Sequence, residues 1–186
     1  MFSVVVISHN RQKSLLKLLK SIPRGPVDGE AIEIVVVDSS MPPVIVPQDQ
    51  DIQYVRTLPF GEKVSAKLNI GIRVSQGDRF ILLADDGYMM PGSIEQAMRL
   101  SRNFPPQSMG TFFMNAYLSS GQEVCLCNTE MCNLIMRKDE FFELGGFDER
   151  FSFKFIDNEI MHRMYRSGYT LQVVVGCCWV HDPKED

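Results

Sequence analysis

Three clusters of polar residues each follow an apolar segment of the chain: Ser8-His9-Asn10, Asp38-Ser39-Ser40 and Asp85-Asp86-Gly87. Carboxylate oxygens are good ligands for hard divalent cations, and a positioned carboxylate can also act as a general base. In open α/β sheets, ligands bind beyond the carboxyl ends of the strands. If the three apolar segments are neighbouring parallel strands, the clusters are predicted to converge on one crevice.

The segments that must position these clusters alternate between strand patterns and helix patterns. Apolar, β-branched runs predict buried strands at Ser3–Ser8, Ile32–Val37, Ile52–Arg56 and Arg79–Ala84. Apolar residues at helical spacing predict one helix capped by Asn10, one over Gly61–Ser75, and one opened by the capping-box pattern Ser93-x-x-Gln96. This repetition with short connections predicts an α/β fold with a mostly parallel sheet flanked by helices.

The second half of the chain has a different pattern. Gly110–Leu118 and Glu123–Cys127 flank a polar, glycine-containing turn, which predicts a hairpin. The remaining segments predict a short strand, two helices and two extended stretches, at Asn133–Arg137, Lys138–Leu144, Asp157–Ser167, Thr170–Val175 and Cys177–His181. The chain of 186 residues therefore suits a single domain, 1–186, with two dissimilar halves, 1–104 and 105–186.

Composition and missing motifs exclude several classes of protein. The formal net charge of −4 gives no support for a nucleic-acid partner. The chain has neither the glycine-lysine loop of P-loop NTPases nor the glycine fingerprint of dinucleotide-binding domains. No apolar run approaches the roughly 20 residues that cross a bilayer. Five cysteines without a C-x-x-C spacing indicate reduced thiols, so we expect a cytoplasmic protein, with peripheral attachment to a membrane as the alternative.

The sequence resembles the inverting glycosyltransferases of family 2, which have the GT-A fold, from Val4 to about Tyr169. The most specific matching segment is Phe141–Glu149, which contains Gly145-Gly146-Phe147-Asp148. The other matching segments are Val4–Arg11, Ile34–Ser40, Asn69–Ile72, Leu82–Asp86 and Asp157–Glu159. The segment Leu82–Asp86 falls where the family has its metal-binding D-x-D motif.

The resemblance implies a transfer of sugar from a nucleotide-diphosphate donor, a UDP-sugar first, to a hydroxyl of a glycan, lipid-linked or protein acceptor. It implies Asp157 as the catalytic base, and Asp86 with His181 as ligands of Mn²⁺ or Mg²⁺. The residues implied to contact the donor are Ser8, Asn10, Asp38, Lys67, Asn69 and Asp85. Residues 1–104 would then bind the nucleotide sugar and residues 105–186 would face the acceptor, with an additional domain or subunit completing the acceptor site.

Departures from the family pattern leave alternatives open. Ala84 stands at the first D-x-D position, Leu68 where an arginine is frequent, and Ile156 where a glutamate usually precedes the base. A degenerate domain that binds nucleotide or glycan without transfer is the main alternative. A sugar nucleotidylyltransferase would open with a glycine-rich, arginine-containing loop, and a receiver domain would lack the hairpin. Asp157 could also serve only as a helix cap, and Glu159 with Arg163 as an exposed ion pair.

Overall fold

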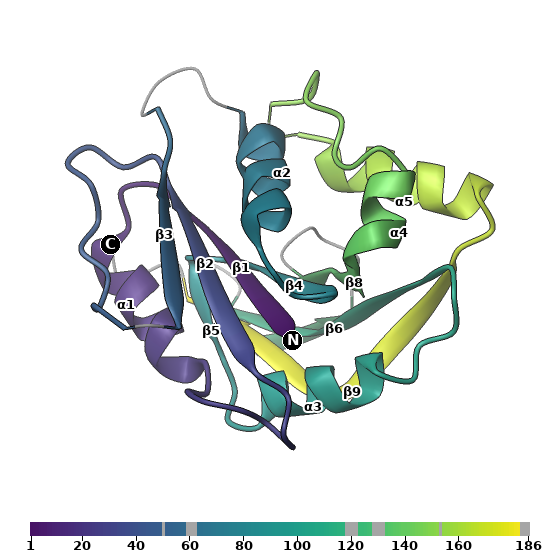
Figure 1. Ribbon diagram of the computed structural model, residues 1–186, viewed down its shortest axis with the longest axis horizontal. Helices are drawn as coiled ribbons and strands as arrows, with labels where there is room; N and C mark the ends of the chain where they lie inside the picture. Colours follow the sequence, from purple (N-terminus) through teal and green to yellow (C-terminus); the bar gives the residue numbers. More distant parts are fainter. Residues whose placement is uncertain (50, 59–62, 118–122, 128–132, 153, 183–186) are drawn as a thin grey trace.

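The computed structural model describes residues 1–49, 51–58, 63–117, 123–127, 133–152 and 154–182. Its strands are β1 Phe2–Ser8, β2 Ile32–Asp38, β3 Ile52–Arg56, β4 Arg79–Ala84, β5 Gly87–Met89, β6 Ser108–Tyr117, β7 Glu123–Cys127, β8 Ile135–Arg137 and β9 Thr170–His181. Its helices are α1 Gln12–Ser21, α2 Val64–Val74, α3 Ser93–Ser101, α4 Lys138–Glu143 and α5 Ile156–Arg166. In the described residues these strands form one nine-stranded sheet with helices on both faces, the α/β fold that the sequence predicts (Figure 1).

The order of strands in the sheet is β3-β2-β1-β4-β8-β6-β9-β5, with β7 paired to β6. The first four strands in this order are parallel, as the strand–helix repetition predicts. The second half is mixed, because β8 runs antiparallel to β4 and β6 antiparallel to β8, while β9 runs parallel to β6. The predicted hairpin strands pair antiparallel as β6 and β7; its turn lies outside the described residues.

The hydrophobic core has two layers, one on each face of the sheet. Successive side chains along β1 point to opposite faces of the sheet. Val4 and Val6 belong to the core layer under α1 and α3, and Val5 belongs to the layer under α2, α4 and α5. Figure 1 shows α1 and α3 on one face and α2, α4 and α5 on the other. All seven residues of β2 are buried, as expected for a strand covered on both faces.

Gly71 allows α2 to lie close against the sheet. A Cβ atom at this position would stand 2.5 Å from Val5 Cγ1 and 2.9 Å from Val37 Cγ2, far inside van der Waals contact. The glycine of the Asn69–Ile72 segment therefore has a packing role, which fixes the distance between α2 and the parallel strands β1 and β2.

The predicted caps of two helices are wrong, and a predicted interruption between the last two extended segments is absent. Asn10 has φ 57° and the cap of α1 is Arg11, because the Asn10 side chain accepts a hydrogen bond from Met41 N instead. The cap of α3 is Gly92, and the Ser93 hydroxyl donates to the Cys178 carbonyl of β9. The two extended stretches before His181 form one strand, β9, with Gly176 at φ 82° inside it.

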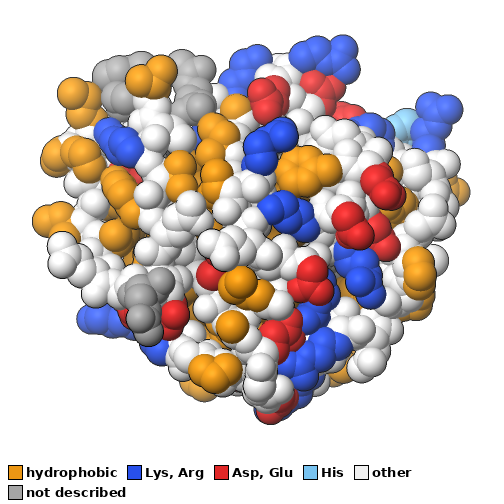
Figure 2. Space-filling view, viewed as in Figure 1, with side chains coloured by type: hydrophobic (Ala, Val, Ile, Leu, Met, Phe, Trp, Pro, Cys, Tyr) orange, Lys and Arg blue, Asp and Glu red, His pale blue; other side chains and the backbone are white. Residues whose placement is uncertain are grey.

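The surface carries charges of both signs. On the face seen in Figure 2, basic and acidic side chains lie interspersed rather than in one basic patch. No helix among the described residues has the length and apolar character needed to cross a membrane.

Candidate active site at the carboxyl ends of the parallel strands

The parallel register brings the predicted polar clusters to one edge of the sheet. Ser8 pairs with Asp38 across β1 and β2, and Ile7 pairs with Ala84 across β1 and β4. Asp85 and Asp86 follow Ala84 directly, so they lie beside the end of β1. The predicted convergence of the three clusters is therefore the geometry observed.

Asp85 is turned toward the protein. Its Oδ2 accepts a hydrogen bond from Ser8 Oγ at 2.7 Å and from the His9 backbone N–H at 3.3 Å. Burial raises the pKa of this carboxyl to about 6, although those hydrogen bonds and the nearby Arg11 charge act in the opposite direction. Ser8 and Asp85, both predicted to contact the donor, thus contact each other.

Asp86 faces two cationic or ionisable groups from distant parts of the chain. Its Oδ2 lies 2.8 Å from an Arg11 guanidinium nitrogen and 3.6 Å from His181 Nε2. Arg11 also lies 3.6 Å from Asp85 Oδ1. We call Ser8, Arg11, Asp85, Asp86 and His181 the edge cluster.

The pairing of β5 with β9 holds Asp86 next to His181. Gly87 pairs with His181, and the Asp182 N–H donates to the Asp86 carbonyl at 2.8 Å. A Cβ on Gly87 would stand 2.3 Å from the Val180 carbonyl oxygen, so only glycine permits this approach. The His181 ring stacks on Trp179 with centroids 5.5 Å apart, which fixes its plane.

The donors of the edge cluster fit a divalent cation as a partial set. Asp86 offers a carboxylate oxygen and His181 an imidazole nitrogen, which suit Mn²⁺ among other metals. Ala84 supplies no ligand, and no group of three potential metal-ligating side chains exists among the described residues. A cation bound here would therefore need oxygens from the nucleotide diphosphate and from water to complete its coordination.

Asp38 is fully buried, and its carboxylate is held by the chain itself. It accepts hydrogen bonds from the backbone N–H groups of Ser40 and Val44, from the Tyr54 hydroxyl at 2.6 Å, and from Arg56 at 3.1 Å. Burial opposes ionisation, but these hydrogen bonds outweigh it, and the pKa lies below its ordinary value. The carboxylate thereby fixes the loop that leaves β2.

A second polar contact lies on that loop. The buried Lys67 ammonium group donates to Ser39 Oγ at 2.8 Å. The His9 ring nitrogen Nδ1 lies 3.1 Å from the same hydroxyl and 3.1 Å from the Ser39 carbonyl oxygen. Lys67 thus brings a positive charge from α2 to the exits of β1 and β2, near the edge cluster.

The two predicted asparagines have different surroundings. The Asn10 backbone N–H donates to Ser40 Oγ at 2.6 Å, so Asn10 joins the β1 and β2 exits. Asn69 lies in the middle of α2, where its amide makes a reciprocal pair with the Phe147 backbone at 2.9 Å and donates to Glu149. Asn69 therefore connects α2 to the Gly146-Phe147 turn.

Asp157 is the second residue of α5, whose cap is Phe155, so it is not the cap of its helix. Its Oδ1 accepts the Asn158 N–H at 3.0 Å. No hydrogen bond or ion pair joins it to the edge cluster within the described residues. Asp157 is therefore a half-buried residue at the start of α5. Its catalytic role remains a prediction.

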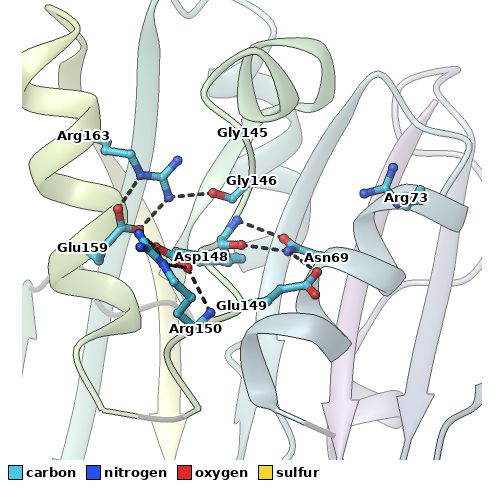
Figure 3. Close-up of a pocket in the computed structure, with 10 residues that line it drawn as sticks. Asn69, Arg73, Gly145, Gly146, Asp148, Glu149, Arg150, Glu159 and Arg163 are labelled. Carbon is cyan, nitrogen blue, oxygen red and sulfur yellow. Dashed lines mark hydrogen bonds and ion pairs between the residues drawn. The ribbon is translucent and has the colours of Figure 1, made fainter.

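Beside α5 the surface is hollowed by a cavity of about 440 Å³. Figure 3 shows the cavity between α5, α2 and the turn after α4, with the Arg163 and Glu159 side chains paired at its wall. Arg163 also donates to the Leu144 and Gly146 carbonyls. The Glu159–Arg163 ion pair, one of the two alternatives left open by the sequence, is present, but it is partly buried instead of exposed. The further contacts of Arg163 hold the double-glycine turn against α5. Of the predicted donor residues, only Asn69 lines this cavity.

Sequence reasoning assigned no role to Arg11 or to the Ser39 hydroxyl. Arg11 directly follows the Ser8-His9-Asn10 cluster, which places it close to the crevice. Its partners, however, are 74 and 75 residues away in the chain, at Asp85 and Asp86. No local pattern could have paired them.

Comparisons with known proteins agree with this architecture. The model of the family described as glycosyl transferase family 2 matches residues 3–114. Several solved structures are similar to this chain at low sequence identity. The structure of GalNAc-T7 with UDP, GalNAc and Mn²⁺ has 14% identity and a TM-score of 0.76, and the match covers 98% of this chain and 44% of that chain. S. aureus TarS 1-349 in complex with UDP-GlcNAc has 15% identity and a TM-score of 0.76 over 100% of this chain and 59% of that chain.

Full S. aureus TarS is similar as well, with 15% identity and a TM-score of 0.73 over 97% of this chain and 36% of that chain. No curated protein matches the chain significantly. The chain thus spans about half or less of GalNAc-T7 and full TarS, and less than two thirds of TarS 1-349. Because the family model covers more than half of the chain, and its solved relatives share the fold described above, the chain belongs to glycosyltransferase family 2 and has the GT-A fold.

Proposed function

We propose that this chain transfers a sugar from a nucleoside diphosphate donor, a UDP-sugar, to an acceptor hydroxyl with inversion at the sugar carbon. The observation that carries the proposal is the edge cluster, in which Asp86 meets His181 and Arg11 at the carboxyl ends of β1 and β4. The uridine nucleotide is proposed because the similar structures named above hold UDP or UDP-GlcNAc.

Charge at the diphosphate is the first requirement of such a reaction. Breaking the bond from sugar to diphosphate leaves negative charge on the nucleoside diphosphate. Mn²⁺ or Mg²⁺ held by Asp86 and His181 would offset that charge as a Lewis acid. The buried Lys67 lies at the neighbouring strand exits, where its ammonium group adds positive charge close to the diphosphate.

The nucleotide itself is proposed to lie against the exits of β1 and β2. Asp38 holds the loop that carries Ser39 and Ser40, and Asn10 ties that loop to β1. Asn69 acts at greater distance by fixing the turn after α4 against α2. In this proposal these three residues shape the donor site, whereas Ser8 and Asp85 set the position of Asp86.

Loss of a proton from the acceptor is the second requirement. As the acceptor oxygen forms its bond to the sugar carbon on the face opposite the leaving diphosphate, its proton passes to a carboxylate oxygen of Asp157. The α5 helix, tied through Arg163 to the Gly146 turn, holds this carboxylate in place. Asp157 would act as a base through its position against the acceptor hydroxyl and would not need a raised pKa.

The acceptor is proposed to be a glycan, a lipid-linked sugar or a protein side chain. We further propose that residues 1–186 act as one domain and that another domain or subunit contributes to the acceptor site. This chain spans 44% of GalNAc-T7 and 59% of TarS 1-349.

A thermal-shift screen tests the proposed donor. A ligand that binds only the native state raises the melting temperature, and the rise grows with the ratio of the ligand concentration to its Kd. UDP and UDP-sugars with Mn²⁺ or Mg²⁺ are expected to raise it, while adenosine and guanosine diphosphates in the same buffer serve as controls. No rise with any uridine nucleotide would contradict the proposal.

A second candidate function is donor binding without transfer. Ala84 removes one carboxylate from the D-x-D position, and Ile156, where a glutamate usually precedes the base, is buried among apolar side chains. A turnover assay separates the two candidates. Release of UDP from a UDP-sugar at a rate well above that of an Asp86→Ala variant supports transfer or hydrolysis, whereas binding with no release supports the second candidate.

A further inference from the structure

Arg11 contacts the same Asp86 oxygen that a cation bound to Asp86 would need as a ligand. One guanidinium nitrogen is 2.8 Å from Asp86 Oδ2 and 3.6 Å from Asp85 Oδ1. The same Asp86 oxygen is the one that faces His181 at 3.6 Å. A metal ion ligated by Asp86 and His181 would stand within a few ångströms of this guanidinium, and two cations so close repel each other strongly.

The backbone of Arg11 is held by neighbouring hydrogen bonds, whereas its side chain is partly exposed to solvent. Asn10, directly before it, is bound to the β2 exit through Ser40 and Met41. The Arg11 carbonyl accepts the first hydrogen bond of α1, from Leu15 N–H at 3.0 Å. The Arg11 side chain is 38% exposed, so the guanidinium lies at the solvent-facing side of the site and is not enclosed in the core.

The surroundings of Arg11 favour an anion. No acidic residue lies in the first turn of α1, and no side chain caps that end of the helix. The amino end of a helix carries partial positive charge, so a phosphate placed there is stabilised by the helix and by the guanidinium together. Guanidinium groups also bind phosphate oxygens in a planar, two-bond geometry.

We propose that Arg11 is an exchangeable counter-ion, which neutralises Asp86 in the empty site and moves to the donor diphosphate when nucleotide and metal bind. The inference rests on the proposed function of the same site. It has two consequences of opposite sign. Arg11 weakens the binding of a divalent cation alone, and it strengthens the binding of the nucleoside diphosphate once the cation is present. Metal and nucleotide therefore bind cooperatively.

Two titrations on the whole chain test this inference. Mn²⁺ alone is titrated and followed by electron paramagnetic resonance, and UDP is titrated by calorimetry at saturating Mn²⁺. In Arg11→Met, Mn²⁺ alone is expected to bind at least about fivefold more tightly, and UDP at least about fivefold more weakly, the lower range for coupled sites. Arg11→Gln repeats both titrations, so that a folding defect in one variant does not decide the outcome.

Lys17→Met is the matched control. Lys17 pairs with Asp182 at 2.8 Å, next to His181, so the variant removes one positive charge nearby without touching Asp86. It is expected to change both affinities by less than about twofold, since charges beyond direct contact are screened.

The result that would overturn the inference is a change of the two affinities in the same direction, or equal behaviour of the Arg11 and Lys17 variants. Wild-type protein that binds no UDP at all would refute the proposed function instead. The comparison with Mn²⁺ alone would then still decide whether Arg11 competes for Asp86.

Discussion

Asp38 accepts hydrogen bonds from four groups while fully buried, so its charge is part of the folded structure. A carboxyl whose folded pKa lies below its unfolded value stabilises the fold above that unfolded value. The contribution is lost as the pH falls through the folded pKa.

Asp38→Asn is therefore expected to lower the free energy of unfolding at neutral pH by about 1.5–3 kcal/mol, the scale for hydrogen bonds to a charged group. The difference from wild type should stay constant from about pH 7 to about pH 5. It should shrink below about pH 4, where the carboxyl is protonated first in the unfolded chain and then, at a lower pH, in the folded protein. Urea denaturation at several pH values measures it. A difference that does not depend on pH would show that the charge of Asp38 contributes nothing.

A substitution at Asp157 can separate an effect on transfer from an effect on stability. Asparagine keeps the oxygen that accepts the Asn158 N–H, but it cannot take a proton from the acceptor. Asp157→Asn is expected to leave the melting temperature nearly unchanged and to lower transfer by at least ~100-fold, the lower range for loss of a general base.

Glu159→Gln is the control for Asp157, because it changes the other acidic residue of the first turn and weakens the ion pair with Arg163. It should lower the melting temperature and leave transfer per folded molecule within a few-fold of wild type. If Asp157→Asn behaved in that way instead, Asp157 would be a structural residue.

Among the elements, α2 links the exits of β1 and β2, where we propose that the donor binds, to α4 and α5. It carries Lys67 to Ser39 and Asn69 to Phe147, and it approaches the sheet at Gly71. The spacing between α2 and β1 therefore decides whether both contacts form.

Gly71→Ala is expected to lower the free energy of unfolding by about 1–3 kcal/mol, because the added methyl group overlaps Val5 and Val37. Combining it with Val5→Ala removes the closer of the two overlaps, that with Val5 Cγ1, and leaves the one with Val37. The double variant should therefore be more stable than the sum of the two single effects predicts. Simple additivity of the two changes would mean that the helix moves away from the sheet without strain.

Local patterns predicted the strands well and the caps poorly. The bounds Ile52–Arg56 and Arg79–Ala84 agree with β3 and β4. The end of β4 is marked by the change from an apolar run to Asp85-Asp86-Gly87. Ser93 has the residue type of a cap, yet its hydroxyl bonds to Cys178 across the sheet. A pattern within a few residues cannot show such a partner.

At the scale of the whole molecule, the site combines residues that are far apart in the chain. The convergence of three polar clusters follows from parallel strands, and so it could be predicted. The pairing of Arg11 with Asp86, and of Lys67 with Ser39, depends on side-chain reach across the crevice, which strand order does not determine. The position of His181 beside Asp86 depends on the pairing of β5 with β9 at the edge of the sheet, between segments about 90 residues apart in the chain.

Calorimetric titration of UDP in the presence of Mn²⁺, on wild type and on Asp86→Ala, tests the central claim that the nucleoside diphosphate binds at this edge of the sheet. Asp78→Ala is the control, because Asp78 is an exposed carboxylate at the opposite end of β4. We expect saturable binding to wild type and to Asp78→Ala, and binding at least ~10-fold weaker in Asp86→Ala, which corresponds to about 1.4 kcal/mol. Equal affinity in all three proteins, or no binding to wild type, would contradict the account.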